Sequence, residues 1–218
     1  MSKCRLCVVL GLVALLGVPF LAGCGSTGIE RTEAKFASMG QLQAEMNASK
    51  KGVMDVNSAL DGVVASPSDP KSAYQNLVTQ VTALEAQREI VCSRVDALKV
   101  KANECFFAWS ADLDKIQDPD LRLGAEERKT QSKARFDKIR MMSQDVKSSY
   151  DSYWQNLQDL KMALGNDLNA EGIAKCTPTI NTTKELGTKL LSDIDKVSAE
   201  FGAQAAAKAA GAAPEPKY

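Results

Sequence analysis

The sequence contains no histidine, and aromatic residues make up only 6% of its 218 residues. Histidine is the commonest general base and a common metal ligand, so its absence removes the usual centre of metal sites and of nucleophilic sites. The chain also has no glycine-rich phosphate loop and no metal-ligand spacing. We therefore expect a protein that is not an enzyme and that binds neither a metal nor a cofactor.

An excess of charge of either sign is also missing, because 27 basic residues balance 27 acidic ones. Removing residues 1–23 would take away Lys3 and Arg5, leaving 25 basic residues against the same 27 acidic residues. Nucleic-acid binding is typical of domains with a strongly basic face. The composition does not predict a nucleic-acid partner.

Long hydrophobic runs are absent except for one, from about Cys7 to Phe20, which follows Lys3 and Arg5. A positive end before an apolar segment is typical of a secretory signal. A helix of about 14 residues would reach about 21 Å, which is short of the roughly 30 Å hydrocarbon core of a membrane. We expect residues 1–23 to be a cleaved signal peptide rather than a permanent membrane span.

The run ends on Leu21-Ala22-Gly23-Cys24, which resembles the lipobox of bacterial lipoproteins. The resemblance implies cleavage between Gly23 and Cys24, a diacylglycerol on the Cys24 thiol, and an acylated new amino terminus. Two or three acyl chains would hold the protein firmly on a membrane. Gly25 stands where an aspartate would retain a lipoprotein at the inner membrane, so an outer-membrane anchor facing the periplasm is implied. The alternative is a plain signal peptide with a chance cysteine.

Three other cysteines remain after such a cleavage: Cys92, Cys105 and Cys176. Cys92 and Cys105 lie 13 positions apart in one expected helix, which separates them by about 20 Å, far beyond the roughly 7 Å between the Cα atoms of a disulfide. Either could meet Cys176 across helices. The favoured interpretation is that all three are small apolar core residues.

Apolar residues of the mature chain recur with alternating spacings of three and four, and strand-like alternation is almost missing. This pattern predicts four helices, at residues 30–64, 70–117, 121–164 and 170–201. Pro67 and Pro70, and later Pro119, are expected to separate the first three, with Ser68 or Asp69 as a cap. Gly165 is expected to end the third helix in a left-handed conformation, and Pro178 to kink or restart the fourth.

Short loops and heptad spacing predict an all-α fold, an elongated antiparallel helical bundle resembling a coiled coil over residues 30–203. A lipidated leader, residues 24–29, would precede it. The tail, residues 204–218, is rich in alanine and proline and is expected to be a fraying alanine helix that becomes disordered near Pro214. A long hairpin of the middle two helices, with the outer helices pairing in a dimer, remains an alternative.

Two charged residues occupy positions of the apolar repeat in the second helix, Arg88 and Asp112. A charge there is costly unless it is paired, so each either meets a partner on a neighbouring helix or extends to solvent. Trp109 follows Phe106 and Phe107, and its place in the repeat favours a core position over a binding platform.

Three motifs resemble a family of bacterial lipoproteins catalogued as domain of unknown function 2959. They are "FFAWSADL" at 106–113, "DLRLGAEERKTQSKARFDKIRMM" at 120–142 and "LKMALGNDLNAEGI" at 160–173. The resemblance supports the helical fold and implies no activity, cofactor or catalytic residue.

Together these features predict an outer-membrane-anchored periplasmic lipoprotein that acts as a structural or interaction protein, a scaffold or spacer. Its partners would be the membrane, through the lipid, and other proteins or a second copy. Attachment to peptidoglycan through Lys217 is disfavoured, because Tyr218 follows it. The alternative function is a holdase or cargo-binding module with a groove lined by methionines, namely Met39, Met46, Met54, Met141 and Met142.

Overall fold

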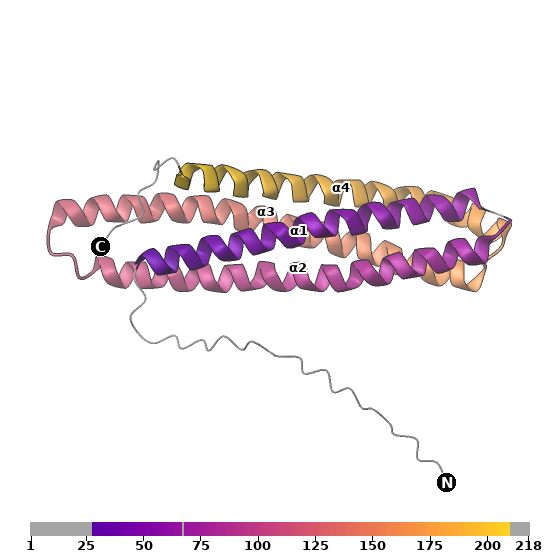
Figure 1. The fold of residues 1–218 in the computed structure, drawn as a ribbon, viewed down its shortest axis with the longest axis horizontal. Helices are drawn as coiled ribbons and strands as arrows, with labels where there is room; N and C mark the ends of the chain where they lie inside the picture. The colour runs from indigo at the N-terminus through magenta and orange to yellow at the C-terminus, as the bar shows by residue number, and fades with distance from the viewer. Residues whose placement is uncertain (1–27, 67, 210–218) are drawn as a thin grey trace, which may run out of the picture.

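The computed structural model describes residues 28–66 and 68–209, and this part of the chain forms four helices and no strand. The helices are α1 (Gly28–Ala65), α2 (Pro70–Leu113), α3 (Pro119–Asn166) and α4 (Ala170–Ala209). They run alternately in opposite directions along one long axis, joined by short turns (Figure 1). The predicted all-α, elongated antiparallel bundle is confirmed.

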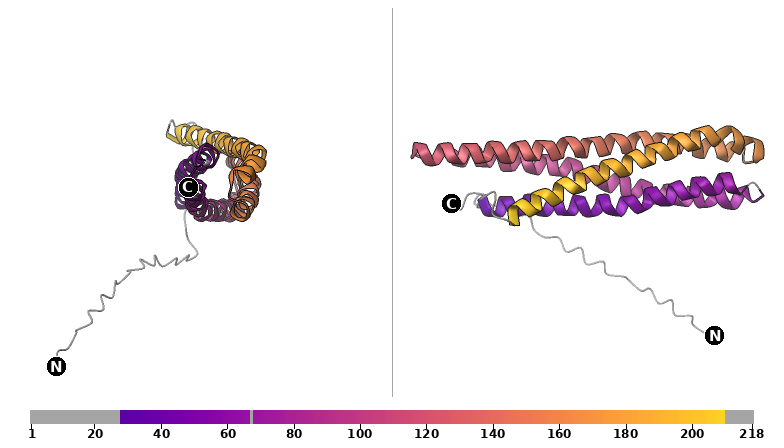
Figure 2. Two further views of the ribbon diagram at one scale, coloured as in Figure 1. Left: turned by 90° about the vertical axis from the view of Figure 1, so that its right-hand side faces the viewer. Right: turned by 90° about the horizontal axis from the view of Figure 1, so that it is seen from above.

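The helices are arranged in a ring, in which each packs against the next and α4 packs against α1 (Figure 2). Helix α4 starts beside α3 and crosses toward α1 along its length, as the view from above shows. The turn between α2 and α3 extends beyond the start of α1 and the end of α4 (Figure 1). Helix α3 has 48 residues, so the rod is about 72 Å long.

Three side chains cap the N-termini of α2, α3 and α4. Each accepts a hydrogen bond from the backbone N–H three residues later. Asp69 does so for α2 at 3.2 Å, Asp118 for α3 at 3.0 Å and Asn169 for α4 at 2.9 Å. Proline follows both aspartates, at a helical position that needs no backbone donor. These local signals explain why the loops are short and the helices antiparallel.

The predicted apolar repeat forms the core. Every repeat position of α1 from Met39 to Val63 is buried, and two tyrosines of α3, Tyr150 and Tyr153, are the largest fully buried side chains. The core of α2 and α4 follows the same repeat, with buried residues Leu77, Val81, Leu84, Val91, Val95, Leu98, Ala102, Ile173, Ile180, Leu190, Ile194, Val197 and Phe201.

Two predicted helix ends are wrong. Helix α2 ends at Leu113 rather than at residue 117, because the chain must turn there to reach Asp118, whose backbone is extended before Pro119. Ile116 therefore lies in the turn, half-buried. Helix α4 extends to Ala209 rather than ending at residue 201, and residues 204–209 are helical, as expected for the start of the alanine-rich tail. The Gln204 side chain donates to the backbone oxygen of Arg135 at 3.2 Å, and the remainder of the predicted tail lies outside the described residues.

Neither Pro178 nor Gly165 interrupts its helix. Pro178 lies inside α4 on an exposed face, where the backbone carbonyl that loses its partner can reach water, so the predicted restart is wrong. Gly165 lies one residue before the end of α3 at Asn166, so the predicted helix end is confirmed but the left-handed backbone is not. A Cβ there would lie 2.7 Å from the Tyr74 hydroxyl. That hydroxyl donates to the backbone oxygen of Lys161 at 2.9 Å. The glycine therefore permits the close approach of α2 to α3.

Candidate functional site

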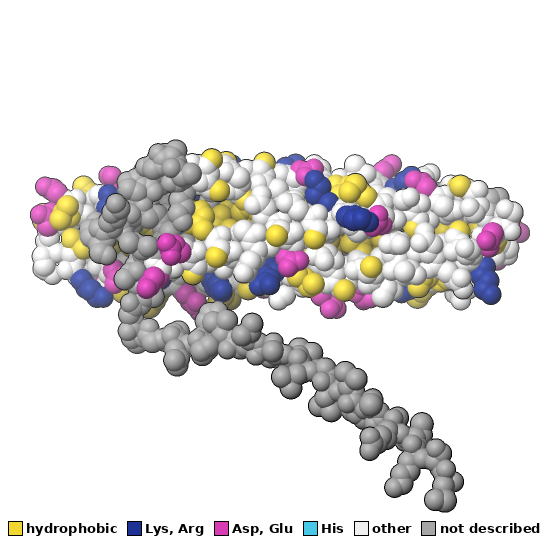
Figure 3. All heavy atoms as spheres, viewed as in Figure 1, with side chains coloured by type: hydrophobic (Ala, Val, Ile, Leu, Met, Phe, Trp, Pro, Cys, Tyr) yellow, Lys and Arg dark blue, Asp and Glu magenta, His cyan; other side chains and the backbone are white. Residues whose placement is uncertain are grey.

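The lipidation and cleavage residues predicted from the sequence, Gly23, Cys24 and Gly25, lie outside the described residues. Among the described helices, none is long and apolar enough to span a membrane. In the same part of the chain, no group of three or more metal-ligating side chains is placed to hold a metal ion. The face of the rod in Figure 3 mixes acidic, basic and apolar side chains along its length.

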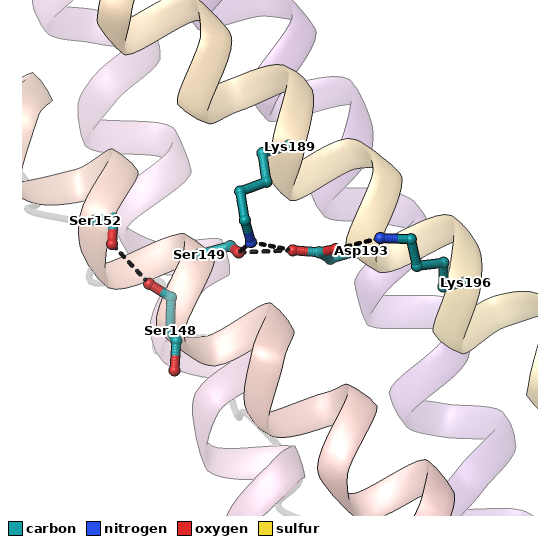
Figure 4. Close-up of polar contacts among 6 residues, drawn as sticks. All are labelled: Ser148, Ser149, Ser152, Lys189, Asp193 and Lys196. Atoms are coloured by element: carbon teal, nitrogen blue, oxygen red, sulfur yellow. Dashed lines mark hydrogen bonds and ion pairs between the residues drawn. The ribbon is translucent and has the colours of Figure 1, made fainter.

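The most densely connected polar site is a cluster between α3 and α4, formed by Ser149, Lys189, Asp193 and Lys196 (Figure 4). We call it the Asp193 cluster. The Asp193 carboxylate accepts from the Ser149 hydroxyl at 2.7 Å, from Lys189 Nζ at 2.6 Å and from Lys196 Nζ at 2.9 Å. Lys189 Nζ also donates to the Ser149 oxygen at 2.6 Å. The Asp193 side chain is 8% exposed, whereas the two lysines are 60% and 62% exposed.

These contacts set the charge of Asp193. Burial alone would raise the pKa of its carboxyl, but the hydrogen bonds from Lys189, Lys196 and Ser149 outweigh burial and lower the pKa to about 2. The carboxylate is therefore ionised at neutral pH and its oxygens are occupied by donors. Such a group is a poor acid or base, and the arrangement acts as a polar link between α3 and α4.

The sequence analysis did not identify the Asp193 cluster. Lys189 and Lys196 lie four residues before and three residues after Asp193, which is the spacing of neighbours on one helix face. That spacing was a usable signal for the ion pairs within α4. No signal in the sequence identifies Ser149 as a member of the cluster, because only the packing of α3 against α4 brings residues 149 and 193 together.

Both charged residues of the α2 repeat find partners on neighbouring helices. Arg88 forms an ion pair with Asp151 of α3, and Asp112 forms one with Arg31 of α1. The hydrogen bond with Asp151 raises the pKa of Arg88. The pKa of Asp112 is lowered by hydrogen bonds, first from Lys115 and then from Arg31. Of the two interpretations, pairing across helices is the correct one.

The aromatic residues near the α2–α3 turn are mainly core. Phe106 lies parallel to Trp109, with ring centroids 6.4 Å apart, and meets Phe136 edge-on at 5.9 Å. Phe106 and Phe136 are buried, and Trp109 packs half-buried against them. Phe107, in contrast, is 79% exposed on the other side of α2.

Another interhelical contact joins α1, α3 and α4, nearer to the α1–α2 turn than to the α2–α3 turn. The Tyr153 hydroxyl donates to Asn57 Oδ1 at 2.8 Å. Gly187 of α4 lies against this pair, since a Cβ there would lie 2.9 Å from the Asn57 side chain and 3.1 Å from the Tyr153 ring.

No disulfide joins Cys176 to Cys92 or to Cys105. Cys105 is buried and the other two are half-buried, as expected for small core residues. Burial raises the pKa of the Cys92 and Cys176 thiols, which makes both poor nucleophiles at neutral pH.

The methionines do not line one groove. Met39 and Met46 are buried in the core, and Met142 packs half-buried against it. Met54 of α1 and Met141 of α3 are exposed, on different helices.

Residues 28–204 match the model of a family described as "Protein of unknown function (DUF2959)". The chain belongs to this family. The match covers α1 to α3 and most of α4, so the family resemblance of the sequence motifs is confirmed over the bundle. No curated protein and no solved structure matches the chain.

Proposed function

We propose that this protein is an outer-membrane lipoprotein on the periplasmic side, whose helical rod serves as a non-enzymatic scaffold or spacer. One observation carries the proposal. Helix α1 begins at Gly28, only four residues after the lipobox cysteine Cys24, and it begins near one end of the rod.

Contacts identify which end this is. Near the start of α1, Arg31 pairs with Asp112 close to the end of α2, and Lys35 Nζ donates to the Ser132 hydroxyl of α3 at 3.4 Å. The start of α1 therefore lies in the half of the rod that carries the α2–α3 turn, and this turn extends beyond it. A lipid on Cys24 would hold that end near the membrane, and the 38 residues of α1 would carry the α1–α2 turn about 57 Å away.

Ion pairs between neighbouring helices support a rod whose helices stay packed side by side. Ion pairs tie neighbouring helices at several levels, including Lys147 to Asp96 at 2.9 Å and Lys138 to Glu200 at 2.6 Å. With the Asp193 cluster they join α3 to both α2 and α4. A holdase would need an accessible apolar groove, and two of the five methionines proposed to line it are buried.

Lipid attachment is tested by metabolic labelling with an alkyne palmitate, comparing the wild-type chain with Cys24→Ser. We expect label on the wild type, loss of label in the variant, and accumulation of the unprocessed wild-type chain under globomycin. A wild-type chain that stays unlabelled and water-soluble would contradict the anchor.

Orientation is tested by energy transfer from a dye on a single introduced cysteine to acceptor lipids in vesicles. Asp118→Cys marks the α2–α3 turn and Ser68→Cys marks the opposite end. We expect strong transfer from the first and weak transfer from the second, because the 44 residues of α2 separate them by about 66 Å. Equal transfer from both would show that the rod lies flat and is not a spacer. If the transfer differs as expected, partners of the α1–α2 turn would be sought next by crosslinking in cells.

A further inference from the structure

Helix α2 has a second apolar repeat on the side that faces away from the core. We call it the outer stripe. Seven of its nine residues are apolar, namely Ala83, Ala86, Ile90, Ala97, Val100, Phe107 and Ala111; the other two are Ser93 and Glu104. The spacings alternate strictly between three and four, and all nine residues are exposed. Ile90, Val100 and Phe107 are 42%, 56% and 79% exposed.

The outer face of α3 differs. On the exposed face of α3, residues with the same alternating spacing of three and four include one apolar residue, Met141. This run is Lys138, Met141, Asp145, Ser148, Ser152, Gln155 and Asp159. An apolar repeat of three and four is the pattern of a helix that pairs with another helix, and a solvated face does not require it. The outer stripe is therefore a helix-pairing surface that the bundle itself leaves uncovered.

We propose that the outer stripe pairs with the outer stripe of a second copy of this chain, with the two α2 helices parallel and in register. Some stripe residues begin a spacing of three, as Ile90 does before Ser93. In a parallel pair, the residue directly before such a position lies opposite the residue that is five positions later in the sequence of the partner helix. Glu89 and Arg94 stand in this relation, and two-fold symmetry repeats the pair. Asp96 and Lys101 have the same spacing, but Asp96 already pairs with Lys147 of α3 within the chain, so Glu89 and Arg94 carry the register.

The antiparallel arrangement lacks this complementarity. There, flanking positions of the same kind face each other, which would bring Arg94 near its own copy. Like charges so placed oppose association. The parallel pair brings Glu104 against its own copy, but it also pairs Glu89 with Arg94 twice, so the charge pattern favours the parallel arrangement.

The membrane anchor would impose the same polarity, and this step rests on the proposed function. Two chains held on one membrane through Cys24 would stand with their α2 helices parallel. The outer stripe runs along the rod, so the contact would extend along its length.

The size of the contact predicts where the pair forms. Residues 83–111 span about 42 Å, and a helix face about 10 Å wide would bury about 400 Å² on each chain. Stable protein interfaces bury about 800 Å² on each partner. We therefore expect a pair that is weak in dilute solution and that forms on the membrane, where confinement raises the effective concentration.

Crosslinking through single introduced cysteines tests the proposal in cells that express the full chain. Ser93→Cys and Val100→Cys lie at positions that meet their own copy across a parallel pair. Asp145→Cys and Ser152→Cys on the outer face of α3 are matched controls. With a short thiol crosslinker, we expect dimer yields severalfold higher at the first two positions than at the controls and in the unmodified chain. Equal yields at all four positions, or none above the unmodified chain, would overturn the proposal.

A charge exchange tests the register on the Ser93→Cys background. Glu89→Arg alone should lower the dimer yield severalfold, and adding Arg94→Glu should restore it. Failure of the restoration would overturn the proposed parallel register, as would efficient crosslinking of Ala83→Cys on one chain to Phe107→Cys on another.

If Cys24 takes no lipid but the Ser93→Cys crosslink forms, the anchor fails and the pairing stands. If Cys24 is lipidated and the crosslink stays at control level, the pairing alone fails.

Discussion

Replacing Asp193 by Asn removes one charge from the Asp193 cluster and keeps the shape of the side chain. The pKa of the carboxyl falls from its ordinary value of 3.8 to about 2 in the folded chain, a difference worth about 2.4 kcal/mol. Lys189 and Lys196 are more than half exposed, so solvent screening reduces the effect. We expect Asp193→Asn to lower the free energy of unfolding by about 1 to 1.5 kcal/mol at pH 7.

The pH dependence gives the sharper test. A carboxyl with a depressed folded pKa stabilises the fold above its unfolded pKa, and this stabilisation is lost as the pH falls through the folded value. The difference between wild type and Asp193→Asn should therefore be complete above about pH 5, about half as large at pH 3 and small near pH 2. Urea unfolding followed by circular dichroism at several pH values measures it.

Asp195→Asn is the matched control, because Asp195 lies two residues away, is 61% exposed and pairs with Lys50 at 2.5 Å. An exposed pair contributes little, so we expect a loss of about 0.5 kcal/mol or less. A loss for Asp193→Asn no larger than that of the control, or one that does not change between pH 7 and pH 3, would refute the reasoning.

Three further substitutions probe the contacts between helices by the same unfolding assay. Gly187→Ala should cost about 1 to 3 kcal/mol, because the new methyl would overlap the Asn57 side chain; an unchanged unfolding midpoint would show that α4 can shift without loss. Tyr74→Phe should cost about 1 kcal/mol through the lost hydrogen bond to α3, and a neutral result would mean that the tyrosine contributes only packing. Asp151→Asn should cost about 0.5 to 1 kcal/mol by removing the charge partner of Arg88, with the loss shrinking at high salt; salt-independence would contradict an electrostatic origin.

Helix number, order and most boundaries could be predicted, because they depend on signals within a few residues of each other. Apolar spacing identified the buried face of α1 from Met39 to Val63, and proline after Asp69 and Asp118 marked where α2 and α3 begin. The errors came where distant residues compete with a local signal. The left-handed backbone predicted at Gly165 is one example: α3 does end one residue later, but the glycine serves to admit Tyr74 from another helix.

The sequence by itself determined that the described chain is a four-helix rod, because a repeat of three and four buries one face of each helix whatever its partner is. Only the tertiary structure decided which helices are neighbours, and so which charges pair. It joined Arg88 to Asp151, Arg31 to Asp112 and Ser149 to Asp193. Hydrophobic burial is roughly proportional to area and has no direction, whereas a hydrogen bond or an ion pair needs two groups at a defined distance. Those distances exist only once the helices have packed.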